Sequence, residues 1–297
     1  MTDTYVLGDW GTTRLRLFRM ADGVVVDRAD GPGIGMLDTP PAQVLMQLLE
    51  GWRAETPLAD VTLCGMAGAR GGLVEAAYVP CPAGIDAWRA GQTRMLIDGL
   101  RISVVPGIRC RSIAGVPDVM RGEETQIFGA MAVDPALAKG ERVFLLPGTH
   151  SKWAHVVDGA LESFVTCPTG ELHELLSQRS TLTGPAQRGG KGDFQEGFAH
   201  GLGRASEALM TALFEARAAR MLDDRSRDWA TGYLSGLLIG SEVAAQASVT
   251  GEVIVVGAPA LCGLYAQALQ AASMTSRLMA GEATALAGLN IARSGIA

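Results

Sequence analysis

Residues 6–18 read VLGDWGTTRLRLF, and an Asp-Gly pair follows at residues 22–23. The same arrangement returns in mid-chain, where residues 143–157 read VFLLPGTHSKWAHVV and a second Asp-Gly pair stands at residues 158–159. Each copy predicts a buried strand, a turn of small residues, a second strand and a tight hairpin into a third strand. A three-strand unit that occurs twice indicates a duplicated domain.

The small-residue turn in each copy is a candidate phosphate site. Glycine and threonine in a tight turn leave backbone N–H groups free to face phosphate oxygens, and the hydroxyls add further donors. A single copy would be an ordinary β-turn, so the interpretation depends on the repetition. Two such turns, one in each half, are expected to hold a polyphosphate between them. Asp9, at the end of an apolar strand, is expected to hold a metal ion directly or through its waters. The predicted phosphate-binding residues are Gly11, Thr12, Thr13, Gly148, Thr149, His150, Ser151 and Lys152.

The composition indicates a soluble globular enzyme. The chain has 297 residues, of which 48% are hydrophobic and 19% are charged. Its net charge of −6 argues against general nucleic-acid binding, which needs a basic face. The five scattered cysteines lack metal-ligand spacing and are expected to be reduced thiols. With no secretory segment and no apolar run of membrane-spanning length, we expect a cytoplasmic protein without membrane association. The composition is also compatible with a homo-oligomer.

The order of predicted elements is the same in both halves and resembles the actin, Hsp70 and hexokinase architecture. This resemblance implies an α/β fold of two duplicated ribonuclease H-like domains, each with a mixed five-stranded sheet flanked by helices. We expect the domains at residues 1–139 and 140–297, with a closing helix from about 282 that packs back on the first domain. The first half predicts strands near 4–9, 14–20, 24–28, 61–65 and 102–106, with helices at about 41–53 and 123–132. The second half predicts three strands within 143–166, long helices near 194–222 and 228–247, strands near 252–256 and 277–279, and helices at about 260–270 and 282–292.

A candidate catalytic base lies in RGEETQ at residues 121–126, at the start of a predicted helix. A carboxylate there can accept a hydroxyl proton during phosphoryl transfer, although acidic residues also suit any helix N-terminus. Sugar kinases of the glycerol-kinase type carry an aspartate directly after the glycine, which favours Glu123, whereas the exopolyphosphatase-like branch aligns better with Glu124. Both remain candidates, and Glu123 is slightly preferred.

The nucleoside and the phosphoryl acceptor have weaker signals. In VIVVGAPAL at residues 253–261, a buried strand delivers a glycine to a helix start, where an adenosine would fit; a plain strand-to-helix turn is the simpler alternative. The glycine-rich stretch at 31–35 is expected to be a flexible loop over a substrate. The predicted adenosine-binding residues are Gly257, Ala258 and Pro259, and the predicted substrate-binding residues are Gly33, Gly35, Gly65, Met66, Arg70 and Arg121.

Several segments together resemble one specific family, the 2-dehydro-3-deoxygalactonokinases. They are DWGTT at residues 9–13, MRGEETQ at 120–126, PGTHSKW at 147–153 and TGELH at 169–173, in an order that spans nearly the whole chain. The resemblance implies ATP- and Mg²⁺-dependent phosphorylation of the 6-hydroxyl of 2-dehydro-3-deoxy-D-galactonate, a sugar acid of galactonate catabolism. One departure is the stretch ARGG at residues 69–72, which makes the exact sugar acid less certain than the reaction type.

Two other functions fit the same residues. A phosphatase or exopolyphosphatase would use water in place of the sugar hydroxyl, with the same turns and the same glutamate. A non-catalytic sugar-acid sensor would close on its ligand without chemistry, and turnover of ATP with a sugar acid separates it from a kinase.

Overall fold

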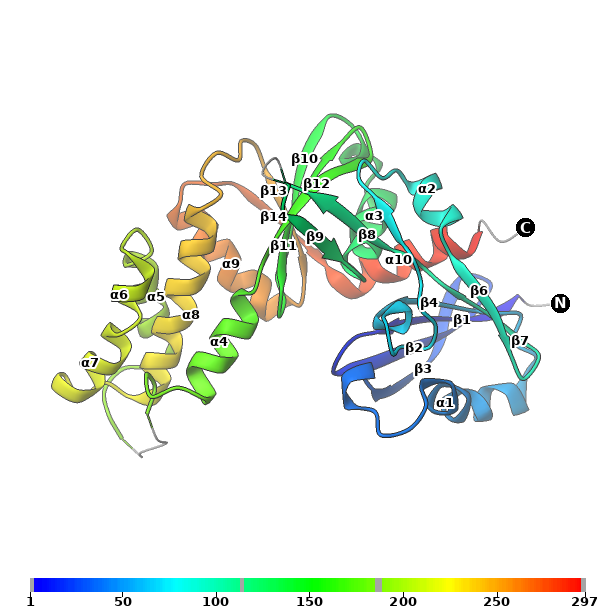
Figure 1. Cartoon of the computed structure of the whole chain (residues 1–297), viewed down its shortest axis with the longest axis horizontal. Coiled ribbons are helices and arrows are strands. Elements are labelled where there is room, and N and C mark those ends of the chain that lie inside the picture. Colours follow the sequence, from blue (N-terminus) through cyan, green and yellow to red (C-terminus); the bar gives the residue numbers. More distant parts are fainter. Residues whose placement is uncertain (1–2, 113–114, 185–188, 295–297) are drawn as a thin grey trace. The chain divides into compact units, whose positions relative to one another are not determined.

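A computed structural model describes residues 3–112, 115–184 and 189–294 (Figure 1). The chain forms two compact units. Unit 1 contains Met1–Glu141, Ala154–Val165 and Gly281–Ala297, and unit 2 contains Arg142–Trp153 and Thr166–Ala280. The expected border of the duplicated domains at residues 139 and 140 stays a prediction.

The first sheet has six strands in the order β3-β2-β1-β4-β7-β6. Strand β1 is antiparallel to β2 and parallel to β4, so the sheet is mixed. Helix α1 (Pro41–Glu55) buries Leu45, Leu49 and Trp52 in a core with residues of β1, β2 and β4. The strands are β1 (Thr4–Trp10), β2 (Arg14–Ala21), β3 (Val24–Pro32), β4 (Val61–Gly65), β6 (Thr93–Ile97) and β7 (Leu100–Val104).

The second sheet has five strands in the order β12-β11-β10-β13-β14. Three consecutive strands are followed by a fourth that pairs in parallel with the first of them, as in the first sheet. This repeated order confirms the predicted duplicated α/β fold. The strands are β10 (Glu141–Leu146), β11 (Ser151–Val157), β12 (Ala160–Cys167), β13 (Val253–Gly257) and β14 (Ser276–Ala280), and helix α9 (Pro259–Ala271) follows β13.

The first sheet differs from the predicted five strands because β6 adds a sixth. It pairs antiparallel with β7 across a turn at Asp98 and Gly99, both of which have positive φ. A small separate sheet, β5-β8-β9, was also not predicted. Its strands are β5 (Tyr78–Pro80), β8 (Gly107–Arg111) and β9 (Pro117–Met120), and helix α2 (Ile85–Ala90) lies between β5 and β6 in the sequence.

The predicted long helix at residues 194–222 was wrong. The segment forms α5 (Phe194–Gly203), α6 (Leu209–Ala212) and α7 (Glu215–Leu222), and α8 follows at Arg227–Ala244. Helix α5 packs directly on α8: a Cβ atom added at Gly236 would lie 2.0 Å from the Phe198 carbonyl oxygen. Helix α5 ends at Gly203, a poor helix former.

Helix α10 (Gly281–Ser294) packs on α3 (Glu123–Val133) within unit 1 (Figure 1). The two helices approach so closely that a Cβ atom at Gly129 would lie 1.8 Å from the Thr284 carbonyl oxygen. At Gly288 it would lie 2.0 Å from the Thr125 carbonyl oxygen. The glycines therefore fix α10 against the helix that begins with the candidate base.

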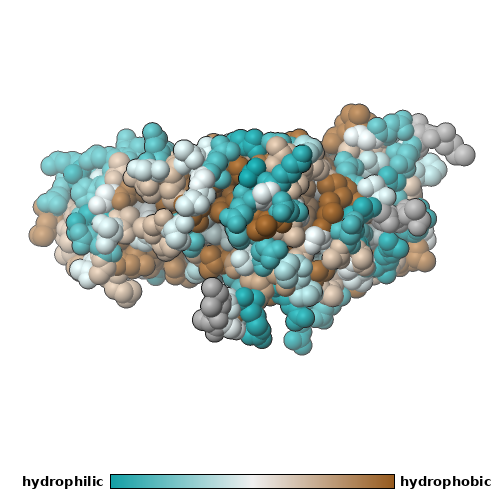
Figure 2. Space-filling view, turned by 90° about the horizontal axis from the view of Figure 1, so that it is seen from above, coloured by the Kyte–Doolittle hydropathy of each residue, from teal (hydrophilic) through white to brown (hydrophobic). Residues whose placement is uncertain are grey.

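Across the described residues, no helix combines the length and the hydropathy needed to span a bilayer. On the face seen in Figure 2, hydrophobic side chains are scattered among hydrophilic ones. This mixture is ordinary, because a large share of a folded protein's surface is apolar.

Candidate active site

The first predicted phosphate turn joins β1 to β2 and is held by the chain after β3. The Gly11 N–H donates to the Arg14 carbonyl at 2.8 Å, and the Gly35 N–H donates to the Thr12 carbonyl at 2.9 Å. A Cβ atom at Gly33 would lie 2.4 Å from the Thr12 carbonyl oxygen. Gly33 and Gly35 are thus tied to the turn, which corrects their prediction as a flexible loop; contact with substrate stays a prediction. Thr12 and Thr13 are exposed, so their hydroxyls are accessible.

Asp9 lies at the end of β1 among groups that come from three strands. Its carboxylate forms a hydrogen-bonded ion pair with Arg16, its cross-strand partner on β2. Its Oδ1 atom also lies 3.7 Å from Sγ of Cys64, the partner of Asp9 on β4. Burial and the Asp9 charge raise the pKa of the Cys64 thiol well above its usual value, so the thiol stays protonated and can donate.

Two glycines bring the start of α3 to Asp9. Gly65, at the end of β4, has a φ of +74°, and Gly122, before α3, has a φ of +114°. A Cβ atom at Gly122 would lie 3.3 Å from Cα of Gly65, and one at Gly65 would lie 2.7 Å from the Trp10 carbonyl oxygen. Positive φ and close backbone approach together require glycine at both positions. The structure therefore brings Asp9, Gly65 and the candidate base together.

Glu123 and Glu124 occupy different environments at the start of α3. Glu124 is fully buried, and both of its carboxylate oxygens accept the Gly122 N–H, at 2.7 and 2.9 Å. Burial, followed by the Glu123 charge, raises the pKa of Glu124 to about 8. Glu123 is half-buried and accepts the Arg121 N–H at 3.1 Å. Of the two glutamates, Glu123 is the one that is partly exposed to solvent.

Of the two arginines predicted to bind substrate, Arg121 is half-buried and Arg70 is exposed. The Arg121 guanidinium donates to the Ala76 carbonyl at 2.8 Å and lies over the Tyr78 ring, 4.2 Å from its centroid. Its Nε and Nη1 atoms are buried without a hydrogen-bond partner among the described residues. Buried donors of this kind indicate a missing acceptor. Met66 lies in the short 3-10 helix η2 (Met66–Gly68) after β4.

The second predicted phosphate turn is held by helix α4 (Thr169–Gln178) within unit 2. The Glu171 N–H donates to the Thr149 carbonyl at 2.9 Å, and the Glu171 carboxylate pairs with His150 at 2.8 Å. A Cβ atom at Gly170 would lie 2.3 Å from the Gly148 carbonyl oxygen. Thr149 and His150 are exposed, as a phosphate site requires.

Ser151 and Lys152 face inward instead. The Ser151 hydroxyl, fully buried, lies 2.8 Å from Glu242 Oε1, and Lys152 Nζ donates to the His150 carbonyl at 3.2 Å. The Ser151 hydroxyl therefore stabilises the turn, and binding of phosphate by Ser151 stays a prediction.

Glu242, on α8, was not predicted. It accepts hydrogen bonds from Trp153 Nε1 at 2.8 Å and from the Tyr265 hydroxyl at 2.7 Å, besides that of Ser151. The carboxylate is buried and connects the second turn to α8 and α9. Burial and the Glu242 charge raise the pKa of Tyr265, which keeps this donor protonated.

The predicted adenosine residues lie beside the second turn, in the same unit. A Cβ atom at Gly257 would lie 3.6 Å from the Pro147 carbonyl oxygen and 3.2 Å from Cys262 Sγ. Ala258 and Pro259 are exposed at the start of α9. A planar ligand at Gly257 would thus be adjacent to a polyphosphate on the turn.

A metal ion would find few protein ligands here. No group of three or more His, Cys, Asp or Glu side chains that could hold a metal exists among the described residues. Mg²⁺ in phosphoryl-transfer sites is usually held by one or two carboxylates together with phosphate oxygens and water. Asp9 fits such a site, because its carboxylate ends a strand beside the exposed Thr12 and Thr13.

Comparison with known proteins identifies the family. The sequence model of the family described as 2-keto-3-deoxy-galactonokinase matches residues 9–292. The 2-dehydro-3-deoxygalactonokinase of Escherichia coli strain K12 is 34% identical over an aligned length of 297, and the alignment covers 97% of this chain and 97% of that one. A crystal structure from Sinorhizobium meliloti, of a protein provisionally named 2-dehydro-3-deoxygalactonokinase, has a TM-score of 0.86 and 33% identity, covering 98% of this chain and 96% of that one. A ROK family glucokinase from Streptomyces griseus, with 14% identity, a TM-score of 0.50 and coverage of 98% of this chain and 100% of its own, shares the fold alone. The chain therefore belongs to the 2-keto-3-deoxy-galactonokinase family.

Proposed function

We propose that this chain is a cytoplasmic kinase that transfers the γ-phosphoryl group of ATP to the 6-hydroxyl of 2-dehydro-3-deoxy-D-galactonate, a step of galactonate catabolism. The observation that carries the proposal is the full-length similarity to the Escherichia coli 2-dehydro-3-deoxygalactonokinase. The placement of Asp9, Gly65 and the start of α3 in one cluster supports it, because phosphoryl transfer needs a metal site and a hydroxyl acceptor close together.

The two turns and Asp9 would bind the nucleotide. The backbone N–H groups and hydroxyls of Thr12 and Thr13, and the backbone of Gly148 and Thr149, are the donors offered to phosphate oxygens. Asp9 would hold Mg²⁺ directly or through water, and the metal would supply neutralisation of charge on the phosphates. The Gly257 to Pro259 segment would receive the adenosine.

Glu123 would accept the proton of the attacking hydroxyl. It is the half-buried member of the pair, whereas Glu124 is enclosed and bound to the Gly122 N–H through both oxygens. Glu124 would then be a positioning residue that fixes the backbone at Gly122. The raised pKa of Glu124, about 8, makes the opposite assignment testable by pH.

Arg121 would bind the carboxylate of the sugar acid. Its two buried, unpartnered nitrogen atoms and its stacking on Tyr78 support an anionic acceptor at this position. Arginine suits this role because its permanently charged group donates charge-assisted hydrogen bonds to a carboxylate. Arg70 is exposed and would contribute only if the loop that carries it closes on the ligand.

The test is turnover by the purified protein with ATP, Mg²⁺ and a panel of sugar acids and neutral sugars. We expect ADP formation only with 2-keto-3-deoxy sugar acids, and a phosphomonoester on C6 by ³¹P NMR. Release of inorganic phosphate without any sugar acid would instead assign a hydrolase. Binding of a sugar acid without ADP formation would assign a sensor. Faster phosphorylation of glycerol or glucose than of any sugar acid would refute the substrate class.

A further inference from the structure

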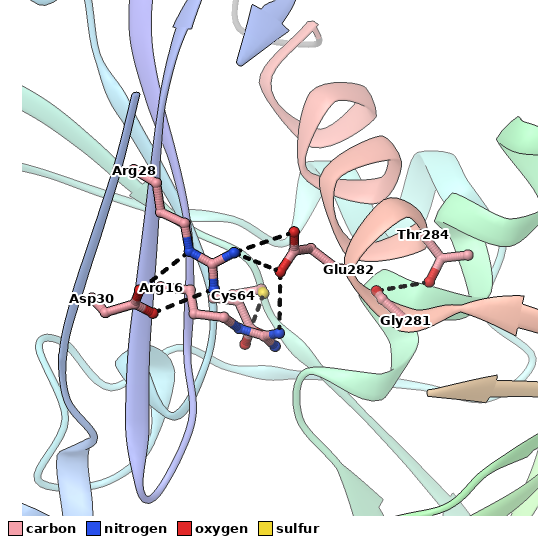
Figure 3. Close-up of polar contacts among 8 residues, drawn as sticks. Arg16, Arg28, Asp30, Cys64, Gly281, Glu282 and Thr284 are labelled. Carbon is pink, nitrogen blue, oxygen red and sulfur yellow. Dashed lines mark hydrogen bonds and ion pairs between the residues drawn. The ribbon is translucent and has the colours of Figure 1, made fainter. Parts of the chain in front are cut away.

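Asp9 is one end of a row of alternating charges in unit 1, and Figure 3 labels the other members, Arg16, Arg28, Asp30 and Glu282. Strand pairing aligns Asp9 with Arg16 and Arg16 with Asp30, so the three side chains lie across β1, β2 and β3. Glu282, in the first turn of α10, lies between Arg16 and Arg28. One acid of the row, Asp9, is the proposed metal ligand.

Arg16 is shared between two carboxylates. Its Nη2 atom is bonded to Asp9, and its Nη1 atom lies 3.7 Å from Glu282 Oε2. The side chains of Arg16 and Asp9 are 29% and 17% exposed, whereas that of Glu282 is 45% exposed. A small rotation of the guanidinium group would therefore transfer Arg16 from the more enclosed acid to the more exposed one.

Glu282 is held in place to receive Arg16. Its two oxygens lie 3.1 and 3.4 Å from Arg28 Nη1, and Arg28 is in turn fixed by Asp30, at 3.2 Å from Nε. Figure 3 shows Arg28 pointing toward both acids. The helix that carries Glu282 cannot shift easily, because α10 packs on α3 through Gly129 and Gly288.

An arginine bonded to Asp9 opposes a divalent cation at the same carboxylate, since the two positive charges repel each other. We propose that Arg16 is a movable counter-ion: it neutralises Asp9 in the empty site and moves to Glu282 when Mg²⁺ and nucleotide bind. Glu282 is then a positioning residue, which acts on the metal site through Arg16. This inference rests on the proposed function, specifically on Asp9 as the metal ligand.

The test measures Mn²⁺ binding to the full-length protein in the presence of ADP, by electron paramagnetic resonance of the free ion. In Glu282→Gln, Arg16 has lost its second partner and remains on Asp9, so Mn²⁺ should bind about three- to fivefold more weakly, the size of an exposed ion pair. In Arg16→Gln the competitor is gone, so Mn²⁺ should bind more tightly by a similar factor. The double variant should equal Arg16→Gln alone, because Glu282 acts only through Arg16.

Glu55→Gln is the matched control. It makes the same carboxylate-to-amide change in unit 1 but outside the row, where the acid contacts Arg19. Mn²⁺ affinity should stay at the wild-type value. ADP affinity in EDTA should be equal in all variants, which separates an effect on the metal from an effect on the nucleotide.

Mn²⁺ affinity should change in opposite directions in Glu282→Gln and Arg16→Gln, which would not occur if the two residues had only a structural role. The proposal that Arg16 is a movable counter-ion would be overturned if both variants changed Mn²⁺ affinity in the same direction or not at all. It would also be overturned if Glu282→Gln still had an effect in the Arg16→Gln background. Absence of Mn²⁺ binding in the wild-type protein with ADP would overturn the metal site of the proposed function, and the inference with it.

Discussion

The two small-residue turns follow the same strand pattern but are supported in opposite ways. The turn of unit 1 ends at Asp9, a partly accessible carboxylate whose charge is balanced by Arg16. The turn of unit 2 rests on Glu242, a buried carboxylate that accepts hydrogen bonds from three uncharged donors, namely Ser151, Trp153 and Tyr265. If Arg16 moves as proposed, the Asp9 carboxylate can be offered to a ligand, whereas the Glu242 carboxylate, enclosed by its donors, stabilises the fold.

The largest expected effect is on Asp9. Asp9→Asn keeps the shape of the side chain but removes its charge, so turnover should fall by at least about a hundredfold, as expected for loss of a preorganised electrostatic contact. Because an amide can still accept from Cys64, the melting temperature should change little. Steady-state turnover and thermal unfolding of the same preparation check both statements. Near-normal turnover would remove Asp9 from the mechanism.

The converse substitution is Glu242→Gln in unit 2. An amide cannot accept from all three donors, and its NH₂ group would face one of them. Hydrogen bonds to a charged group contribute about 1.5–3 kcal/mol each, so a loss of about 2 kcal/mol in unfolding free energy is expected. The KM for ATP should rise because the turn that carries Gly148 and Thr149 is less fixed, while the KM for the sugar acid should stay unchanged.

Tyr265→Phe is the control for Glu242. It removes one donor from the same carboxylate, together with a 3.3 Å contact with Ser151, but leaves the 2.8 Å bond between Ser151 and Glu242. The melting temperature should fall, and the KM for ATP should not move. If both variants raise the KM for ATP equally, Glu242 acts through general destabilisation and the contrast between the turns is weaker than stated.

Much of this fold could be predicted because its signals are local. Alternating apolar residues and Asp-Gly pairs placed the three-strand units, and the pair at Asp98 and Gly99 would have revealed β6 by the same rule. The break in the predicted helix at 194–222 was missed although α5 ends at Gly203, a poor helix former that the sequence shows. Family and fold were predicted correctly from motifs that span the chain.

The candidate site was predictable only in part. The sequence predicted the hairpin of β1 and β2, and the register of that hairpin pairs Asp9 with Arg16. The pair itself was not predicted. Glu242 could not be found in this way, because its partner Ser151 lies 91 positions earlier and only the tertiary fold brings them together. The different burial of Glu123 and Glu124 likewise depends on the close approach of Gly122 to Gly65.

The smallest expected effect separates Glu124 from Glu123 by pH. Burial raises the folded-state pKa of Glu124 from its ordinary value of 4.5 to about 8, so the folded protein favours the protonated acid. The folded state then binds more protons than the unfolded state between these two values. The contribution of protonated Glu124 to the free energy of unfolding is complete below about pH 4.5 and is lost as the pH rises through about 8.

Thermal unfolding from pH 5 to 9 should therefore show a decline in stability in the wild-type protein that is absent in Glu124→Gln, whose amide mimics the protonated acid. Glu123→Gln should retain the decline. Turnover distinguishes the roles further, because Glu124 as the base, with a pKa of about 8, would give a rate that rises through that pH. A rise that disappears in Glu124→Gln, together with little loss of rate in Glu123→Gln, would transfer the role of the base to Glu124.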